Sequence, residues 1–181
     1  VLALRGLTVF PHTNLTFDVE RHISMKALEV AMETGQEIFL VTQREINVEK
    51  PTEQDLYAIG TISRVTQILR LGQNSLRVMV EGGRRARLKR LWQLEPYLQG
   101  QVETAEEPES VNHGPKTEAL LRQTWSLFQD YAQLAGNVAE EVIAAALDCQ
   151  EPGDLADLIA QNIALRYDDK QAILEELSPM V

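Results

Sequence analysis

The sequence predicts an α+β protein: a small barrel-type sheet with one helix, followed by a small helical bundle. Three observations support this. Apolar and polar residues alternate before residue 106 at the two-residue period of strands. After residue 116 apolar residues recur every three or four positions, which is typical of helices. Between them, residues 106–116 are acidic and contain two prolines, which indicates a linker.

The first half contains one helix after a strand. Leu15, Phe17 and Val19 alternate with polar residues, which predicts a half-buried strand. Residues 21–35 then change period, because their apolar residues fall on one helical face and Gly35 suits a helix end.

Four further strands follow in the first half. Residues 37–43 form a short apolar run rich in branched side chains, typical of a buried strand. Three longer extended segments cover residues 58–71, 75–91 and 97–105. We expect a hairpin turn at residues 72–74 and a bend or bulge at Gly82-Gly83.

The second half predicts about four helices. Apolar residues of the first recur at helical spacing, namely Leu120, Leu121, Trp125, Phe128 and Ala132. Candidate N-caps start the others, namely Asn137 with Glu140, Asp154, and Asp168 with Gln171. Ser178-Pro179 would end the last helix. We therefore expect a β domain at 1–107, a linker at 108–116 and a helical bundle at 117–181 that leads to a truncated long helix.

The composition narrows the class of protein. The 181 residues carry a formal net charge of −10, which disfavours binding to nucleic acid or anionic lipid. No apolar run reaches the roughly 18 residues that span a bilayer. The single Cys149 near a helix end predicts an inert thiol in a reducing, cytoplasmic setting. A first residue other than Met suggests a fragment of a longer chain.

The residues predict no catalytic, cofactor or metal site. No lysine follows a glycine, so a phosphate-binding P-loop is excluded. The three histidines are scattered without zinc-ligand spacing. The pairs Asp154/Asp157 and Asp168/Asp169 lie at probable helix starts, where capping explains them better than catalysis. No G-x-S-x-G nucleophile motif is present.

One basic cluster leaves two interpretations open. In GGRRARLKRLW, Arg85, Arg87 and Lys89 would line one strand face. They could contact phosphate, with Trp92 as a stacking partner. We favour a solvated face whose cations pair with carboxylates, because the chain as a whole is acidic.

Several blocks of the sequence resemble the N-terminal region of bacterial-type Lon ATP-dependent proteases. In order, they are ALRGLTVFPH, LTFDVERHISMKALEVAM, EIFLVTQRE, PTEQDLYAIGTISRVTQILRL, RVMVEGGRRARL and, in the second half, DCQEPGDLADLIAQNIALRYDDKQAILEEL. The resemblance implies a six-stranded, PUA-like β domain with one helix, then a helical bundle. It also implies a homo-hexameric parent with ATPase and Ser-Lys protease domains downstream. ATP and magnesium would bind there, and this region would need no cofactor.

The same resemblance implies binding of unfolded or damaged proteins. Such chains expose apolar side chains, so we expect a weak, adaptable apolar patch. The candidate residues are Phe10, Pro11, Met32, Leu69, Leu71 and Met79, and each of them is equally well interpreted as ordinary core. Two alternatives remain open. One is a stand-alone adaptor or ligand-binding protein of the same fold, and the other is a small hydrolase or nucleic-acid-processing protein that contacts phosphate through Arg85, Arg87 and Lys89.

Overall fold

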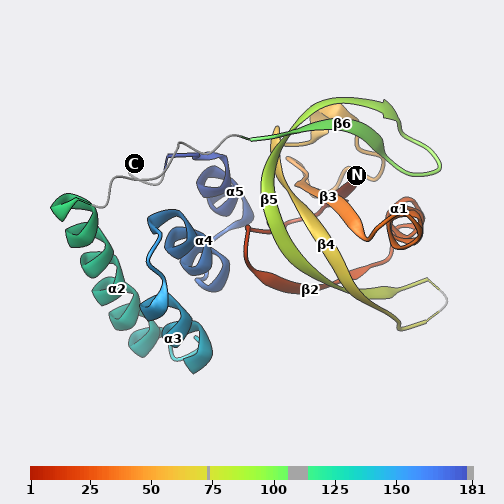
Figure 1. The fold of residues 1–181 in the computed structure, drawn as a ribbon. Helices are drawn as coiled ribbons and strands as arrows, with labels where there is room; N and C mark the ends of the chain where they lie inside the picture. The colour runs from red at the N-terminus through yellow and green to blue at the C-terminus, as the bar shows by residue number, and fades with distance from the viewer. Residues whose placement is uncertain (73, 106–113, 179–181) are drawn as a thin grey trace.

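The computed structural model describes residues 1–72, 74–105 and 114–178, which form a curved sheet with helices at two of its sides (Figure 1). The strands are β1 (Leu2–Leu4), β2 (Asn14–Val19), β3 (Glu37–Thr42), β4 (Ile59–Arg70), β5 (Leu76–Gln93) and β6 (Gln99–Thr104). The helices are α1 (His22–Glu33), α2 (Pro115–Ala135), α3 (Glu140–Asp148), α4 (Pro152–Asn162) and α5 (Tyr167–Glu175). The α+β class is confirmed.

The six strands form one sheet in the order β1-β3-β4-β5-β2, and β6 pairs with β5. The β1–β3 pair is parallel and the other pairs are antiparallel. β5 is 18 residues long, so it borders β4 on one side and both β2 and β6 on the other. Within the described residues no pairing joins β1 to β2 or β6, so the curved sheet stays unclosed.

Strand β1 was absent from the predicted elements. Its three residues, Leu2–Leu4, are all buried. A strand this short, buried on both faces, has no polar alternation by which it could be recognised.

The predicted irregularity at Gly82-Gly83 is a β-bulge. The β4–β5 register passes from Ile62↔Arg84 to Ser63↔Gly82, which leaves Gly83 without a partner on β4. At Gly82 a side chain is excluded, because a Cβ there would overlap the carbonyl oxygen of Phe10. The bulge therefore lets the loop before β2 lie directly against β5.

Helix α1 packs on the inner, concave face of the sheet. Its Ala27, Leu28 and Ala31 are buried in one cluster with β-strand residues that include Val78 and Val80. Full burial of a leucine such as Leu28 contributes about 1.5–3 kcal/mol. The predicted helix over 21–35 is confirmed, and this cluster is the core of the β-rich half.

The four helices of the second half form a bundle beside the sheet. In Figure 1, α5 and α4 lie next to the sheet, and α2 lies farthest from it. The bundle core comprises Leu121, Phe128, Ala146 and Leu155, with Trp125 half-buried against them. The predicted number of helices is confirmed within the described residues.

The predicted N-caps are wrong in position. The residues before the first turns of α3, α4 and α5 are Ala139, Glu151 and Arg166, and none makes a side-chain capping bond. Pro152 starts α4 three residues earlier than expected, because proline is tolerated at the first helical position. Asp154 and Asp168 lie in the first turns instead, where their charge favours the helix dipole.

Part of the predicted organisation falls on residues that the structure leaves undescribed. Of the expected linker, residues 108–113 lie outside the described residues, as do Gln73 of the hairpin turn and Pro179. On either side of the linker, β6 ends at Thr104 and α2 begins at Pro115. The division into a β domain and a helical domain remains a proposal.

Candidate functional site

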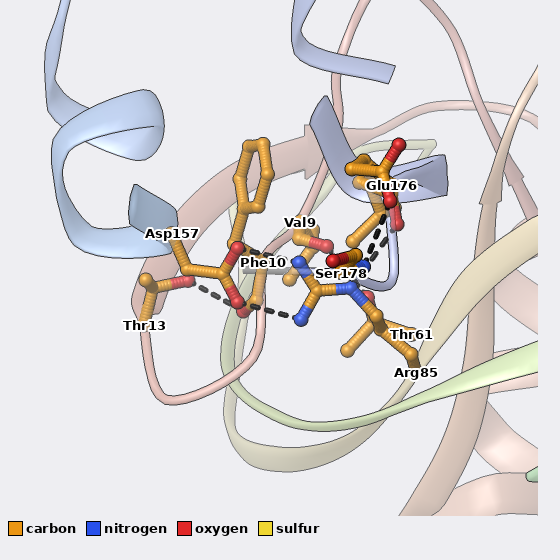
Figure 2. A network of polar contacts seen from close by, with 9 residues as sticks. Val9, Phe10, Thr13, Thr61, Arg85, Asp157, Glu176 and Ser178 are labelled. Carbon is orange, nitrogen blue, oxygen red and sulfur yellow. Dashed lines mark hydrogen bonds and ion pairs between the residues drawn. The ribbon is translucent and has the colours of Figure 1, made fainter. Parts of the chain in front are cut away.

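A buried ion pair joins the sheet to the helical bundle. Arg85 on β5 donates two hydrogen bonds to the Asp157 carboxylate on α4, at 2.8 and 2.6 Å. Arg85 also donates from Nε to the carbonyl oxygen of Leu174 at 3.1 Å. Figure 2 shows the guanidinium facing the carboxylate beside Phe10. The side chains of Arg85 and Asp157 are 8% and 2% exposed, so water screens the pair little.

Apolar contacts and further hydrogen bonds surround this ion pair. Phe10, Ile59, Ala160 and Leu174 form a buried cluster between the sheet and the helices, which we call the junction cluster. The fully buried Gln171 of α5 donates to the carbonyl oxygen of Ile59 at 2.9 Å. Because strand and helix residues share this interior, helices α4 and α5 are docked on the sheet as one packed unit.

The expectation of a solvated basic face is wrong for Arg85. Helix α4 covers this residue, whereas Arg87 and Lys89 of the same strand are exposed. Lys89 forms a surface ion pair with Glu103 at 2.9 Å. Asp157, expected only to favour the start of a helix, is instead the buried partner of Arg85. In this fold Arg85 is therefore unavailable for contact with a phosphate.

Two of the candidate apolar residues lie in the interior. Phe10 is 0% exposed in the junction cluster, and the neighbouring Pro11 is also buried. The buried Thr13 hydroxyl donates to the carbonyl oxygen of Phe10 at 2.7 Å and holds this loop. Phe10 and Pro11 therefore agree with their alternative interpretation as ordinary core, because α4 and α5 cover the loop.

Three other candidates share the outer, convex face of the β4–β5 hairpin. Leu69 lies opposite Arg77 and Met79 opposite Gln67, so strand alternation places all four side chains on one face. Leu71 continues that alternation, because its amide donates to the carbonyl oxygen of Ser75 at 3.0 Å. The exposed fractions are 45% for Leu69, 51% for Leu71 and 39% for Met79. We call Leu69, Leu71 and Met79 the hairpin patch.

One ion pair lies beside the hairpin patch. Arg77 donates to both carboxylate oxygens of Asp18 on β2, at 2.7 and 2.9 Å. This hydrogen bonding by Arg77 lowers the pKa of Asp18. The convex face of β2, β5 and β4 therefore presents apolar side chains next to this neutralised pair, and the exposed Glu81 lies on the same face two residues beyond Met79.

Met32 lies apart from the hairpin patch. It is 39% exposed on α1. Helix α1 packs on the concave face of the sheet, whereas the patch is on the convex face. The structure therefore unites three of the candidates and leaves Met32 as an isolated exposed side chain.

A second candidate surface, a groove, was not predicted from the sequence. A groove of about 680 Å³ lies between the start of α1 and the β5–β6 connection. Its apolar lining includes Ile23, Pro51 and Leu94, and its rim carries the Lys50–Glu95 ion pair at 2.9 Å. Residues from three distant segments meet there, so no local pattern in the sequence could show it.

The described residues contain neither a cluster of three or more His, Cys, Asp or Glu suited to a metal ion nor a helix long and apolar enough to cross a bilayer. Cys149 lies at the C-terminal end of α3 and is partly buried. Burial is the main reason that the pKa of its thiol is raised. A thiol that resists ionisation is a poor nucleophile, which agrees with the expected inert role.

We expect iodoacetamide at pH 8 to alkylate Cys149 more slowly than it alkylates the same cysteine in urea-unfolded protein. The raised pKa leaves less thiolate in the folded state, and partial burial limits access. Mass spectrometry of timed samples measures both rates. Alkylation in the folded protein that matches or exceeds the unfolded rate would show an activated thiol.

The chain matches known sequences along its whole length. Residues 1–181 match the family described as the ATP-dependent protease La (LON) substrate-binding domain. Lon protease of Desulforamulus reducens is 39% identical over 177 residues, which are 98% of this chain and 22% of that protein. Lon protease 1 of Bacillus subtilis is 37% identical over 175 residues, with 97% and 22% covered. The chain spans about a fifth of these relatives.

Solved structures share the fold. The N-terminal domain of Mycobacterium avium complex Lon protease aligns with a TM-score of 0.76 at 20% identity, over 98% of this chain and 89% of that one. A Lon N-terminal domain protein from Xanthomonas campestris aligns with a TM-score of 0.67 at 16% identity, over the same shares. At these identities the likeness concerns the fold alone.

Proposed function

Because this chain belongs to the family of Lon protease substrate-binding domains, we propose that it captures unfolded or damaged protein chains through the hairpin patch. One observation carries this proposal. Leu69, Leu71 and Met79 stand exposed together on one sheet face, where a stable fold gains nothing from their exposure.

The chemistry of the patch suits sequence-tolerant recognition. Unfolded chains differ from native proteins chiefly by exposing apolar side chains, which can cover Leu69 and Leu71. Met79 adds a flexible, polarisable side chain that adapts to different partners. The paired charges of Asp18 and Arg77 remove a free acidic group from the edge of the patch. A broad class of apolar segments can therefore bind there, without a deep pocket to select one sequence.

Binding at a single patch should be weak. Burying three partly exposed apolar side chains contributes only a few kcal/mol, from which the cost of ordering the partner must be subtracted. We expect a Kd in the micromolar range or weaker for the isolated chain. Several copies in a hexameric parent would raise the effective concentration of such sites and strengthen capture. Nanomolar binding by a monomeric sample would contradict this avidity argument.

We propose that the parent protein is a cytoplasmic, hexameric ATP-dependent protease and that the present chain is its non-catalytic region. Nucleotide and magnesium would bind in a downstream domain rather than here. The alternative is a stand-alone adaptor or ligand-binding protein of the same fold. The encoded sequence after Val181 decides between them, because a Gly-Lys-Ser/Thr loop there indicates the protease and a stop codon indicates the adaptor.

Replacing Leu69, Leu71 and Met79 together by serine should weaken binding of an unfolded protein at least about tenfold, because the apolar contact area is lost. The probe is reduced, carboxamidomethylated α-lactalbumin. It is acidic like this chain, so charge attraction cannot drive the binding. Amide chemical shifts measured by NMR during titration report both affinity and location. Natively folded α-lactalbumin should cause no shifts.

The matched control replaces three exposed leucines of α2 by serine. Leu120, Leu127 and Leu134 are 40%, 61% and 90% exposed, but they lie away from the sheet. This variant should bind like the parent chain. Equal weakening in both variants, or none in the patch variant, would exclude the hairpin patch as the capture surface.

A further inference from the structure

We infer that the free edge of β2 binds an extended segment of an unfolded polypeptide as an added antiparallel or parallel strand. This inference rests on the proposed function and specifies how the captured chain is held. Backbone hydrogen bonds along β2 would supply a contact independent of sequence, and the neighbouring hairpin patch would supply the apolar contact.

Strand β2 ends the sheet and pairs only with β5 within the described part of the chain. Gly82 donates its amide to the carbonyl oxygen of Thr13 at 2.8 Å. In an antiparallel pair, the N–H and C=O groups of successive residues point alternately towards the partner strand and away from it. Because the carbonyl of Thr13 points towards β5, the backbone groups of Leu15 and Phe17 do so as well. The backbone groups of Asn14, Thr16 and Asp18 therefore point away from the sheet. No described protein group bonds to them.

The other sheet edges differ from β2. Strand β1 is only three residues long, and the Arg21 side chain donates to the carbonyl oxygen of Ala3. Strand β6 carries Gly100 and the charged Glu103. Natural sheets commonly protect edges by such means, by proline or lysine, or by bulges.

Strand β2 lacks these protecting features. Its sequence NLTFDV contains no proline, glycine or lysine. Its one charged residue, Asp18, is held by Arg77 on the convex face. All six residues pair with β5 in an unbroken register from Asn14↔Glu81 to Val19↔Leu76. The edge is thus regular and long enough to template another strand.

The edge adjoins the hairpin patch. Thr16 lies directly opposite Met79, so both side chains stand on the convex face. A strand added beside β2 would place alternate side chains on that face next to Thr16, with Met79 one strand and Leu69 two strands farther from the edge. Its other side chains would meet the half-buried Leu15 and Phe17 on the concave side.

An unfolded chain fits this edge better than a second copy of the protein. Every polypeptide offers the same backbone donors and acceptors except at proline, whereas the strands of folded proteins are already paired. Two copies of this chain would each bring a formal charge of −10, and like charges oppose their edge-to-edge approach. The occupant is therefore an extended segment exposed by unfolding.

Hydrogen exchange of individual amides tests the inference on the intact chain. With saturating reduced, carboxamidomethylated α-lactalbumin, the amides of Asn14, Thr16 and Asp18 should exchange at least about tenfold more slowly than in the free chain. Amides 137–139, which lie between α2 and α3, should be unaffected. The amides of the hairpin patch could shift on adding the probe while these three amides exchange as fast as in the free chain. That result would contradict strand addition and would still support the proposed function.

Two substitutions at one position separate backbone from side-chain effects. Thr16→Pro removes an outward amide without breaking a bond to β5, and proline is tolerated on a sheet edge. It should weaken binding at least about tenfold, whereas Thr16→Val keeps the amide and should change affinity less than about twofold. Equal affinity for both folded variants would overturn the inference, and absence of any binding by the parent chain would overturn the proposed function with it. If Thr16→Pro does not fold, the exchange measurement decides alone.

Discussion

Replacing Asp157 by alanine is expected to lower the free energy of unfolding by about 3–5 kcal/mol, the usual cost of leaving one charge of a buried pair without its partner. Arg85 would remain enclosed between β5 and α4 and would lose both hydrogen bonds to the carboxylate, while its hydrogen bond to the carbonyl oxygen of Leu174 stays in place. Urea denaturation followed by circular dichroism measures the loss. A single cooperative transition in the parent chain would show that sheet and helices unfold together.

The surface pair of Asp18 and Arg77 serves as the matched control for the buried one. Asp18→Ala should leave the urea midpoint near that of the parent chain, because exposed ion pairs contribute little. The double variant Arg85→Met/Asp157→Leu should recover much of the lost stability, since apolar residues can replace a buried pair. A loss below about 1 kcal/mol for Asp157→Ala would show that water enters the junction and screens the charge.

Phe10→Ala is expected to lower the free energy of unfolding by about 3–5 kcal/mol, because it removes a fully buried ring from the junction cluster. The loss combines the transfer free energy of the ring with the cavity left beside Ile59 and Leu174. Phe10→Leu, which refills part of that volume, should cost less. The same urea denaturation series measures both variants.

Binding data separate this structural role from a role in capture. The folded Phe10→Leu variant should bind unfolded α-lactalbumin as the parent chain does, because Phe10 does not reach the surface. Unchanged stability with weakened binding would instead place Phe10 in the capture surface. That outcome would mean that α4 and α5 leave the sheet when a chain binds.

Local patterns predicted most elements of the fold. Apolar side chains recur at the expected period in the strand Asn14–Val19, in the helix His22–Glu33 and in the two long hairpin strands. The bulge at Gly82-Gly83 also followed from local chemistry, since only glycine permits the close backbone approach. The predicted N-cap positions were wrong because several residues near each helix start are chemically suited to capping. Pro152 rather than Asp154 determined the start of α4.

The candidate surface was only partly predictable. Leu69, Leu71 and Met79 were chosen as apolar residues near a turn or with adaptable side chains, and strand register then placed them on one face. Phe10 and Pro11 were chosen on similar grounds, yet the helical half covers them. The sequence alone does not distinguish an exposed loop from one that lies under a helix about 150 residues later.

By itself the sequence determined the periodicity of each segment, the α+β class and the resemblance to the Lon substrate-binding region, because these depend on neighbouring residues and their order. Only the tertiary structure decided that Arg85 pairs with Asp157, that Phe10 is core and that β2 is a free edge. These features depend on which distant segments pack together. Packing of this kind follows from the total burial and hydrogen bonding of the whole chain rather than from any one segment.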